Sequence, residues 1–183
     1  MNPTLAKTLA IGLTALVLAG NGIAASAADA KDKAQAKAAQ LAWLSTDPTL
    51  VAAVKAQNTN PPAEAKAMTN DQWKTLTVLD PFVKSLSKNT LVEHLKAKKD
   101  DSMSELFVSA ADGTKVAFFS KTTSWSHKGK DKHDLPMKGE TWIGPVEVDQ
   151  SSGVEQIQIA LPVLDGGTAI GSVVIGLATT KLQ

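Results

Sequence analysis

The sequence has no cysteine among its 183 residues. This absence excludes disulfide bonds, thiolate metal sites, covalent haem attachment and a cysteine nucleophile together. The chain is nevertheless long enough to form one domain with a substantial hydrophobic core. Its stability is therefore expected to come from packing and hydrogen bonding.

Arginine and tyrosine are also absent, and all 19 basic residues are lysine. Without arginine, the protein cannot recognise a carboxylate through a planar bidentate fork. An anion would have to be held by lysine, by backbone N–H groups or by hydroxyls. The formal net charge is only +1, and no basic face with interleaved aromatic residues is present, so nucleic acid is not an expected partner.

The segment 1–27 is typical of an export signal. Lys7 supplies a positive charge, residues 8–20 are apolar, and Ala25-Ser26-Ala27 matches a small-x-small cleavage motif. The apolar run is shorter than the roughly 20 residues of a spanning helix, which favours cleavage over the alternative of an uncleaved membrane anchor. We expect a mature chain from about Ala28 that is periplasmic or secreted and does not insert into the membrane.

The mature part, residues 28–183, divides into two segments of different pattern. Residues 28–100 are predicted to be helical, because they combine strong helix formers with cap signals. The clearest signals are the helix formers of residues 30–44, the cap-and-proline pairs Asp47-Pro48 and Asp80-Pro81, and a capping box of Thr69 with Gln72.

Residues 104–183 are predicted to form strands. Residues 154–163 alternate most clearly, with Ile157 and Ile159 on one face and Gln156 and Gln158 on the other. Turn signals at Asp112-Gly113 and Asp165-Gly166-Gly167 separate neighbouring strands. The expected strands are 105–110, 115–122, 142–148, 154–163 and 168–177, followed in a meander with a turn at 149–153. Helices first and strands afterwards indicate an α+β fold, with long N-terminal helices packed on a single antiparallel sheet of about five strands.

Three landmarks in the strand-rich segment resemble the extracellular Cache (PDC, PAS-like) sensor domains, in particular the free-standing periplasmic type. They are the hairpin at Asp112-Gly113, the Ile-x-Ile-x-Leu-Pro-Val strand that ends at Asp165-Gly166-Gly167, and the closing strand at Ile170-Gly171-Ser172-Val173-Val174. The resemblance covers the chain from about residue 35 to the end and implies a PAS-like sheet. It also implies that a loop between strands two and three caps a pocket for organic acids, amines or amino acids.

This sequence departs from the family pattern in that loop. Gly129 is followed by Lys130 and only then by Asp131, so the acidic position is displaced. The amino-acid-binding members also rely on an arginine and tyrosines, which this chain lacks. Their ligand specificity is therefore not carried over.

The loop, residues 123–140, together with Trp142 just after it, holds two of the four tryptophans and two of the three histidines. Loops of this length are usually functional or disordered. We expect Trp125 and Trp142 to form apolar walls of a ligand pocket. The candidate polar contacts are His127, Lys128 and Asp131, with Asp149 at the end of the next strand. Taken singly, His127 and His133 are expected to face water.

Other interpretations of the loop stay open. The imidazoles and carboxylates of residues 127–134 could bind a metal, although their spacing matches no common motif and the intervening lysines would repel a cation. A hydrolase triad would rest on composition alone, so no catalytic residue and no cofactor is predicted. The sequence predicts a non-catalytic, periplasmic small-molecule-binding sensor module that acts through a possible membrane-bound signalling partner. The alternatives are a structural or interaction protein with a degenerate pocket, and a metal-binding periplasmic protein.

Overall fold

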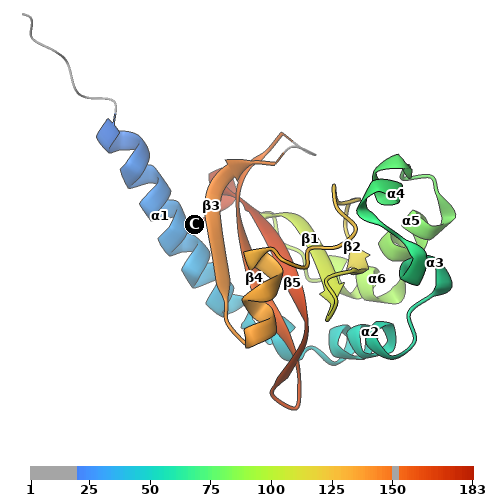
Figure 1. The fold of residues 1–183 in the computed structure, drawn as a ribbon. Helices are drawn as coiled ribbons and strands as arrows, with labels where there is room; N and C mark the ends of the chain where they lie inside the picture. The colour runs from blue at the N-terminus through green and yellow to red at the C-terminus, as the bar shows by residue number, and fades with distance from the viewer. Residues whose placement is uncertain (1–19, 150–152) are drawn as a thin grey trace, which may run out of the picture.

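The computed structural model describes residues 20–149 and 153–183, in which helices come first and strands follow (Figure 1). Residues 1–19, which carry most of the predicted export signal, lie outside the described residues. The helical elements are α1 (Gly20–Gln40), the 3-10 helix η1 (Ala42–Thr46), α2 (Pro48–Thr59), α3 (Ala63–Ala67), α4 (Asn70–Thr75), α5 (Pro81–Ser87) and α6 (Thr90–Lys96).

The predicted cap signals set the starts of three helices. The Asp47 carboxylate caps α2 and precedes Pro48 at the first helical position. Thr69 and Gln72 form the expected capping box of α4. Asp80 caps α5 in the same way as Asp47 caps α2. The predicted helix of residues 30–44 is instead divided, because α1 ends at Gln40 and the chain tightens into η1.

The strands form one antiparallel sheet, which confirms the predicted α+β class. They are β1 (Met103–Ala110), β2 (Lys115–Phe118), β3 (Trp142–Val148), β4 (Glu155–Asp165) and β5 (Thr168–Ala178). The second strand is shorter than predicted, and most of the predicted turn at 149–153 lies outside the described residues.

The order of the strands differs from the predicted meander. The order is β2-β1-β5-β4-β3, so β5 returns to the centre and separates β1 from β4. Turn signals specify only which consecutive strands pair, whereas the centre of a sheet goes to a strand that is buried on both faces. Residues 171–178 of β5 are all buried, and this explains the central position.

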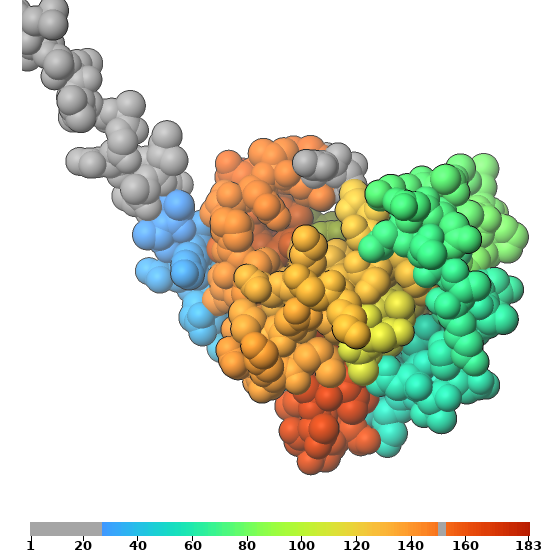
Figure 2. Space-filling model, viewed as in Figure 1, coloured from blue at the N-terminus to red at the C-terminus, as the bar shows by residue number. Residues whose placement is uncertain are grey.

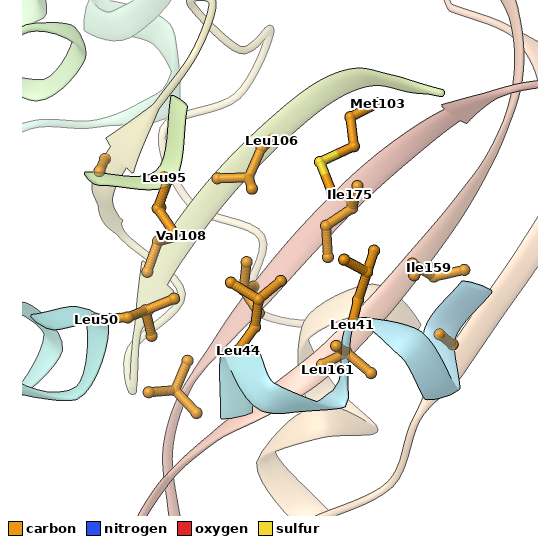
Figure 3. Packing of buried hydrophobic residues seen from close by; sticks show 14 of the residues in the cluster. Leu41, Leu44, Leu50, Leu95, Met103, Leu106, Val108, Ile159, Leu161 and Ile175 are labelled. Carbon is orange, nitrogen blue, oxygen red and sulfur yellow. The ribbon is translucent and has the colours of Figure 1, made fainter. Parts of the chain in front are cut away.

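The first face of the sheet carries the main hydrophobic core. Leucine, isoleucine and valine side chains of β1, β4 and β5 pack there against α1, η1, α2 and α6 (Figure 3). Leu44, Leu50, Ile159 and Ile175 are at most 1% exposed. Each such side chain contributes about 1.5–3 kcal/mol of hydrophobic free energy, so this face supplies most of the stability.

The second face of the sheet is buried as well, and it carries polar side chains beside an apolar cluster. Gln156, Gln158, Ser109 and Ser172 are at most 5% exposed. The loop between β2 and β3, residues 119–141, covers this face together with α3–α5, and it forms the front of the molecule in Figure 2. The period-2 pattern of β4 therefore separates the apolar core from a covered face that carries both glutamines.

An aromatic cluster joins the helices to the β2–β3 loop. The ring of Trp73 in α4 lies 5.2 Å from that of Trp125 and 5.9 Å from that of Phe118, centroid to centroid. The Nε1 atom of Trp73 donates a hydrogen bond of 2.7 Å to the carbonyl of Thr122. This cluster fixes the position of the loop above the second face.

The close approach of β1 to β5 gives a test of the strand order. A Cβ atom on Gly171 would lie 2.4 Å from the Ser109 carbonyl oxygen and 2.8 Å from Val54 Cγ1. Because a backbone atom cannot move aside, Gly171→Ala should lower the free energy of unfolding by about 3 kcal/mol in urea denaturation. Thr168→Ala, at the exposed start of β5, is the control and should change it by less than about 0.5 kcal/mol. An equal effect of the two substitutions would contradict this packing.

Candidate functional site

The β2–β3 loop is an ordered structure. It contains the short helix α7 (Asp131–Asp134) and the 3-10 helix η2 (Pro136–Lys138). The side-chain carbonyl of Asn70 accepts hydrogen bonds of 2.8 and 3.0 Å from the N–H groups of Trp125 and Ser126. Ser126 also forms an isolated β-bridge with Thr114. These contacts hold the loop between the sheet and the helices.

The expectation that His127 and His133 face water is wrong. His127 is 8% exposed and His133 is 2% exposed. His133 Nδ1 lies 2.8 Å from Ser172 Oγ, and its Nε2 lies 3.3 Å from the Ala111 carbonyl oxygen. The His127 ring stacks on Phe107 at a centroid distance of 4.8 Å. The pairing of the loop with the sheet turns both histidines inward, and a one-dimensional pattern of polar residues gave no sign of this.

A fully buried lysine lies beneath His127. Lys115 is 0% exposed, and its Nζ atom lies 2.5 Å from His127 Nδ1 and 3.2 Å from Ser109 Oγ. The same atom lies 4.7 Å from the centre of the Phe107 ring. None of the ion pairs among the described residues involves Lys115. A buried charge without an ion partner is costly, so the environment favours the neutral amine.

The titration of this group of bases follows from their burial. Burial, and then the positive charge of nearby Lys132, hold the pKa of Lys115 well below its usual value. Burial, and then the neighbouring Lys115, lower the pKa of His127 to about 2. Burial also lowers the pKa of His133. At neutral pH both histidines are therefore neutral.

A cavity of about 180 Å³ lies between the second face and the edge of the loop. It is lined by residues of β1, β3 and β4, by the start of the loop, by α7 and by the residue that follows β3. These are Glu105, Phe107, Thr122, Thr123, His127, Lys132, Glu147, Val148, Asp149 and Gln158. A larger cleft, of about 590 Å³, lies between α1 and the C-terminal residues, but the side chains around it are mostly open to solvent. The smaller cavity is the better candidate because the buried polar side chains of His127 and Gln158 and the partly buried carboxylate of Glu105 lie in its walls.

The register of the sheet creates the polar wall of this cavity. Glu105 and Gln158 both pair with Gly176, which lies between them on β5. Since Gly176 has no side chain, the amide of Gln158 reaches across it and donates a hydrogen bond of 2.8 Å to Glu105 Oε2. Lys132 of α7 donates a hydrogen bond of 2.7 Å to Gln158 Oε1 from the other side. The three side chains form one chain of polar contacts.

The charge of the cavity lining is predominantly negative. Glu105, Glu147 and Asp149 are carboxylates, whereas Lys132 is the one lysine in the lining. Burial, and then the charge of Asp149, raise the pKa of Glu105 in spite of its hydrogen bonds from glutamine. The cavity therefore offers a set of hydrogen-bond acceptors with little competing positive charge.

The structure brings together only part of the predicted ligand set. His127 and Asp149 line the cavity. Trp125 is 2% exposed within the aromatic cluster, and its indole N–H has no hydrogen-bond partner among the described residues. Trp142 is half-buried and packs against the same cluster, while Lys128 and Asp131 are exposed outside the cavity lining.

Sequence reasoning missed four lining residues that dominate the site, namely Glu105, Phe107, Lys132 and Gln158. The position of Gln158 was a weak indication of a site, because a glutamine in the middle of an apolar strand needs a hydrogen-bond partner when it is buried. Lys115, in the strand-forming run of residues 115–118, gave a similar signal. Neither pattern indicates which other strand supplies that partner.

The described residues contain no group of three or more histidine, aspartate or glutamate side chains placed to hold a metal ion. Both ring nitrogens of His133 and the Nδ1 atom of His127 are already in contact with protein groups.

Among the described residues, no helix is long and apolar enough to cross a bilayer.

The low pKa of the buried histidines predicts how stability depends on pH. In the unfolded chain a histidine takes up a proton below about pH 6.5, whereas His127 in the folded protein stays neutral down to about pH 2. The unfolded state then binds more protons, so stability present above pH 6.5 is lost as the pH falls. Below about pH 6 the loss due to His127 should approach about 1.4 kcal/mol per pH unit.

This loss can be measured by urea denaturation between pH 7 and pH 4. The stability of His127→Gln should fall less steeply than that of the wild type over this range. His94→Gln is the control, because His94 is only partly buried and its ring binds the Asp47 carboxylate. Parallel curves for His127→Gln and the wild type would show that His127 is protonated in the folded state.

Comparison with solved structures finds proteins whose folds resemble this one at low sequence identity. Neither the comparison with protein-family models nor that with curated proteins finds a match. The fold is similar to the sensor domain of the V. cholerae histidine kinase DctB, with 14% identity, a TM-score of 0.45 and coverage of 85% of this chain and 54% of that chain. It is also similar to the ligand-binding domain of the Pseudomonas aeruginosa amino acid chemoreceptor PctC in complex with GABA, with 12% identity, a TM-score of 0.43 and coverage of 86% and 59%.

A third similar structure is the E. coli DcuS sensor domain, with 15% identity, a TM-score of 0.46 and coverage of 86% of this chain and 95% of that chain. The chain thus spans between half and three fifths of the length of the DctB and PctC structures and nearly all of the DcuS structure. These three structures are described as sensor or ligand-binding domains.

Proposed function

We propose that this protein is a non-catalytic sensor module that binds a small molecule in the cavity between the second face of the sheet and the β2–β3 loop. The observation that carries the proposal is the chain of contacts from Glu105 through Gln158 to Lys132 at the cavity wall. Ligand sites combine a covered cleft with a few converging polar groups. The volume of about 180 Å³ is below the roughly 300–1,000 Å³ of pockets for drug-sized ligands, so it suits a small metabolite.

The composition of the second face supports binding rather than a purely structural role. A partly buried carboxylate such as Glu105 and a buried amine such as Lys115 cost stability that an apolar side chain would not. Perturbed titratable groups concentrated in a cleft are typical of functional sites. In a protein whose pocket had become degenerate, nothing would oppose their replacement by apolar residues.

A binding role also fits these groups better than an enzymatic role. A general base works best when its pKa lies near the operating pH. With a pKa of about 2, His127 is a poor proton acceptor at neutral pH, and Lys115 is fully buried. His127 instead supplies a neutral imidazole in the cavity wall.

The charge of the cavity indicates a cationic ligand. Three carboxylates and one lysine line it, so a protonated nitrogen is favoured over an anion. The amino group of Lys132 occupies the position that such a ligand would take, because it already donates to Gln158. The ammonium group of a ligand would take the place of the Lys132 amino group, and the negative charge of Glu105 would stabilise it in the same way.

Displacement of the Lys132 side chain by a ligand would link binding to signalling. Lys132 belongs to α7, which packs on β3, β4 and β5. Release of its side chain would free α7 to shift on the sheet. A signalling partner could detect this shift on the surface of the β2–β3 loop, because Lys128, Lys130 and Asp131 are exposed there.

A melting screen with small ions tests the sign of the ligand charge. The probes are primary amines that are protonated at neutral pH (ethanolamine and propylamine) and matched anions (acetate and propionate). A probe at about 100 times its dissociation constant should raise the free energy of unfolding by about 2.7 kcal/mol. Glu105→Gln keeps the shape of the side chain but removes the charge, so it should weaken the response to ammonium probes about tenfold or more.

Lys132→Gln should strengthen the same response, because it removes the competing ammonium group. Lys130→Gln, on the same loop but exposed, is the matched control and should respond as the wild type does. The contrary outcome is that anions stabilise the wild type and that Lys132→Gln abolishes this stabilisation. It would show that the cavity binds an anion. If no probe stabilises the protein and the variants do not differ, the alternative of an interaction protein with a degenerate pocket is favoured.

We further propose that the module acts outside the cytoplasm, after cleavage of segment 1–27, through a membrane-bound partner. The support is the export pattern, with the cleavage motif Ala25-Ser26-Ala27. In a Gram-negative host, mass spectrometry of the protein from a periplasmic extract should find an N-terminus at or near Ala28. An intact N-terminus in the membrane fraction would favour the uncleaved anchor.

A further inference from the structure

The two most exposed large hydrophobic side chains among the described residues are neighbours in the chain. Leu79 is 71% exposed and Val78 is 64% exposed. They lie in the turn between α4 and α5, on the side of the molecule opposite α1 in Figure 1. A single exposed apolar residue needs no explanation, but an adjacent pair at the tip of a turn is a candidate contact surface.

An apolar groove of about 370 Å³ continues from this turn to the end of β2. Val83, Phe118 and Phe119 contribute its apolar walls. Lys84, Lys88 and Lys121 line the same groove, and its lining contains no carboxylate. The turn and the groove together are called the lysine-rimmed groove below.

Two further lysines extend the positive charge beyond the rim. The Nζ atoms of Lys96 and Lys99 lie 5.9 and 6.0 Å from the centre of the Phe119 ring. Within the part of the chain that the structure describes, the ion pairs involve none of the five lysines at or beside the groove. Such a concentration of unpaired positive charge on a chain of net charge +1 indicates a negatively charged partner.

We propose that the lysine-rimmed groove binds the surface of an anionic lipid bilayer. Val78 and Leu79 would enter the boundary between headgroups and acyl chains, and the lysines would contact headgroup phosphates. Three features favour a bilayer over a protein partner. The apolar pair protrudes into solvent, as insertion into a soft phase requires. Lysine side chains can extend along the interface from a buried stem. Lysine also acts as a point charge, which suits mobile headgroups more than a fixed carboxylate geometry.

Vesicle flotation tests the proposal with the protein from Ala28 to Gln183. Vesicles of phosphatidylcholine alone are compared with an equimolar mixture of phosphatidylcholine and phosphatidylglycerol. We expect weak, reversible binding to the mixed vesicles and little to phosphatidylcholine. Added salt should release the protein, because the Debye length shortens from about 30 Å at 0.01 M to about 3 Å at 1 M ionic strength.

Two pairs of substitutions separate the apolar and the charged contributions. Val78→Ser with Leu79→Ser, and Lys84→Glu with Lys88→Glu, should each reduce the partition coefficient by about tenfold or more. The matched controls are Val148→Ser, which changes a valine that is 61% exposed on β3, and Lys138→Glu with Lys181→Glu, which reverses two exposed lysines elsewhere. All variants should melt close to the wild-type temperature, because the changed side chains lie mainly at the surface.

Several outcomes would overturn the proposal. One is a wild-type protein that does not float with the mixed vesicles. Another is an equal loss of binding in the groove variants and in the controls, which would indicate an effect of net charge alone. Light scattering that shows a dimer, lost in Val78→Ser with Leu79→Ser, would assign the groove to a second copy of the chain.

Discussion

The burial of the Lys115 amino group constrains the whole second face of the sheet. Lys115 Nζ lies beneath the loop, in contact with His127 Nδ1 and Ser109 Oγ, and none of the ion pairs among the described residues involves it. A neutral amine can be buried at acceptable cost only if its polar atoms are hydrogen-bonded and water stays out. His127 must therefore stay stacked on Phe107, and the loop must stay closed above it. The geometry of the cavity depends on this arrangement.

The two faces of the sheet contribute differently to stability. The first face is packed with aliphatic side chains between the strands and α1, η1, α2 and α6, and such packing supplies the driving force for folding. The second face holds Glu105, Lys115 and two glutamines, which lower stability but offer hydrogen-bond donors and acceptors. A protein is only marginally stable, so the first face and the aromatic cluster around Trp73 have to offset this cost. The cavity lies where the polar face meets the edge of the loop.

The elements of the fold could be predicted because their signals are local. Asp47-Pro48, Thr69 with Gln72, and Asp80-Pro81 start helices through contacts within a few residues. Strands β3 and β5 likewise lie within a residue of their predicted bounds. The strand order could not be predicted in this way, since β5 pairs with β1 across more than 60 intervening positions in contacts such as that of Phe107 with Val174. Turn chemistry contains no information about such distant partners.

The candidate site shows the same division. By itself the sequence determined the α+β class, the alternation of β4 and the absence of arginine and cysteine chemistry. Only the tertiary structure decided that Glu105 and Gln158 meet above Gly176, that both histidines turn inward and that Trp125 belongs to the core. The physical reason is that helix caps and strand patterns depend on neighbours in the chain. A cavity instead depends on the register between distant strands and on the loop that the packing of Trp73 holds over them.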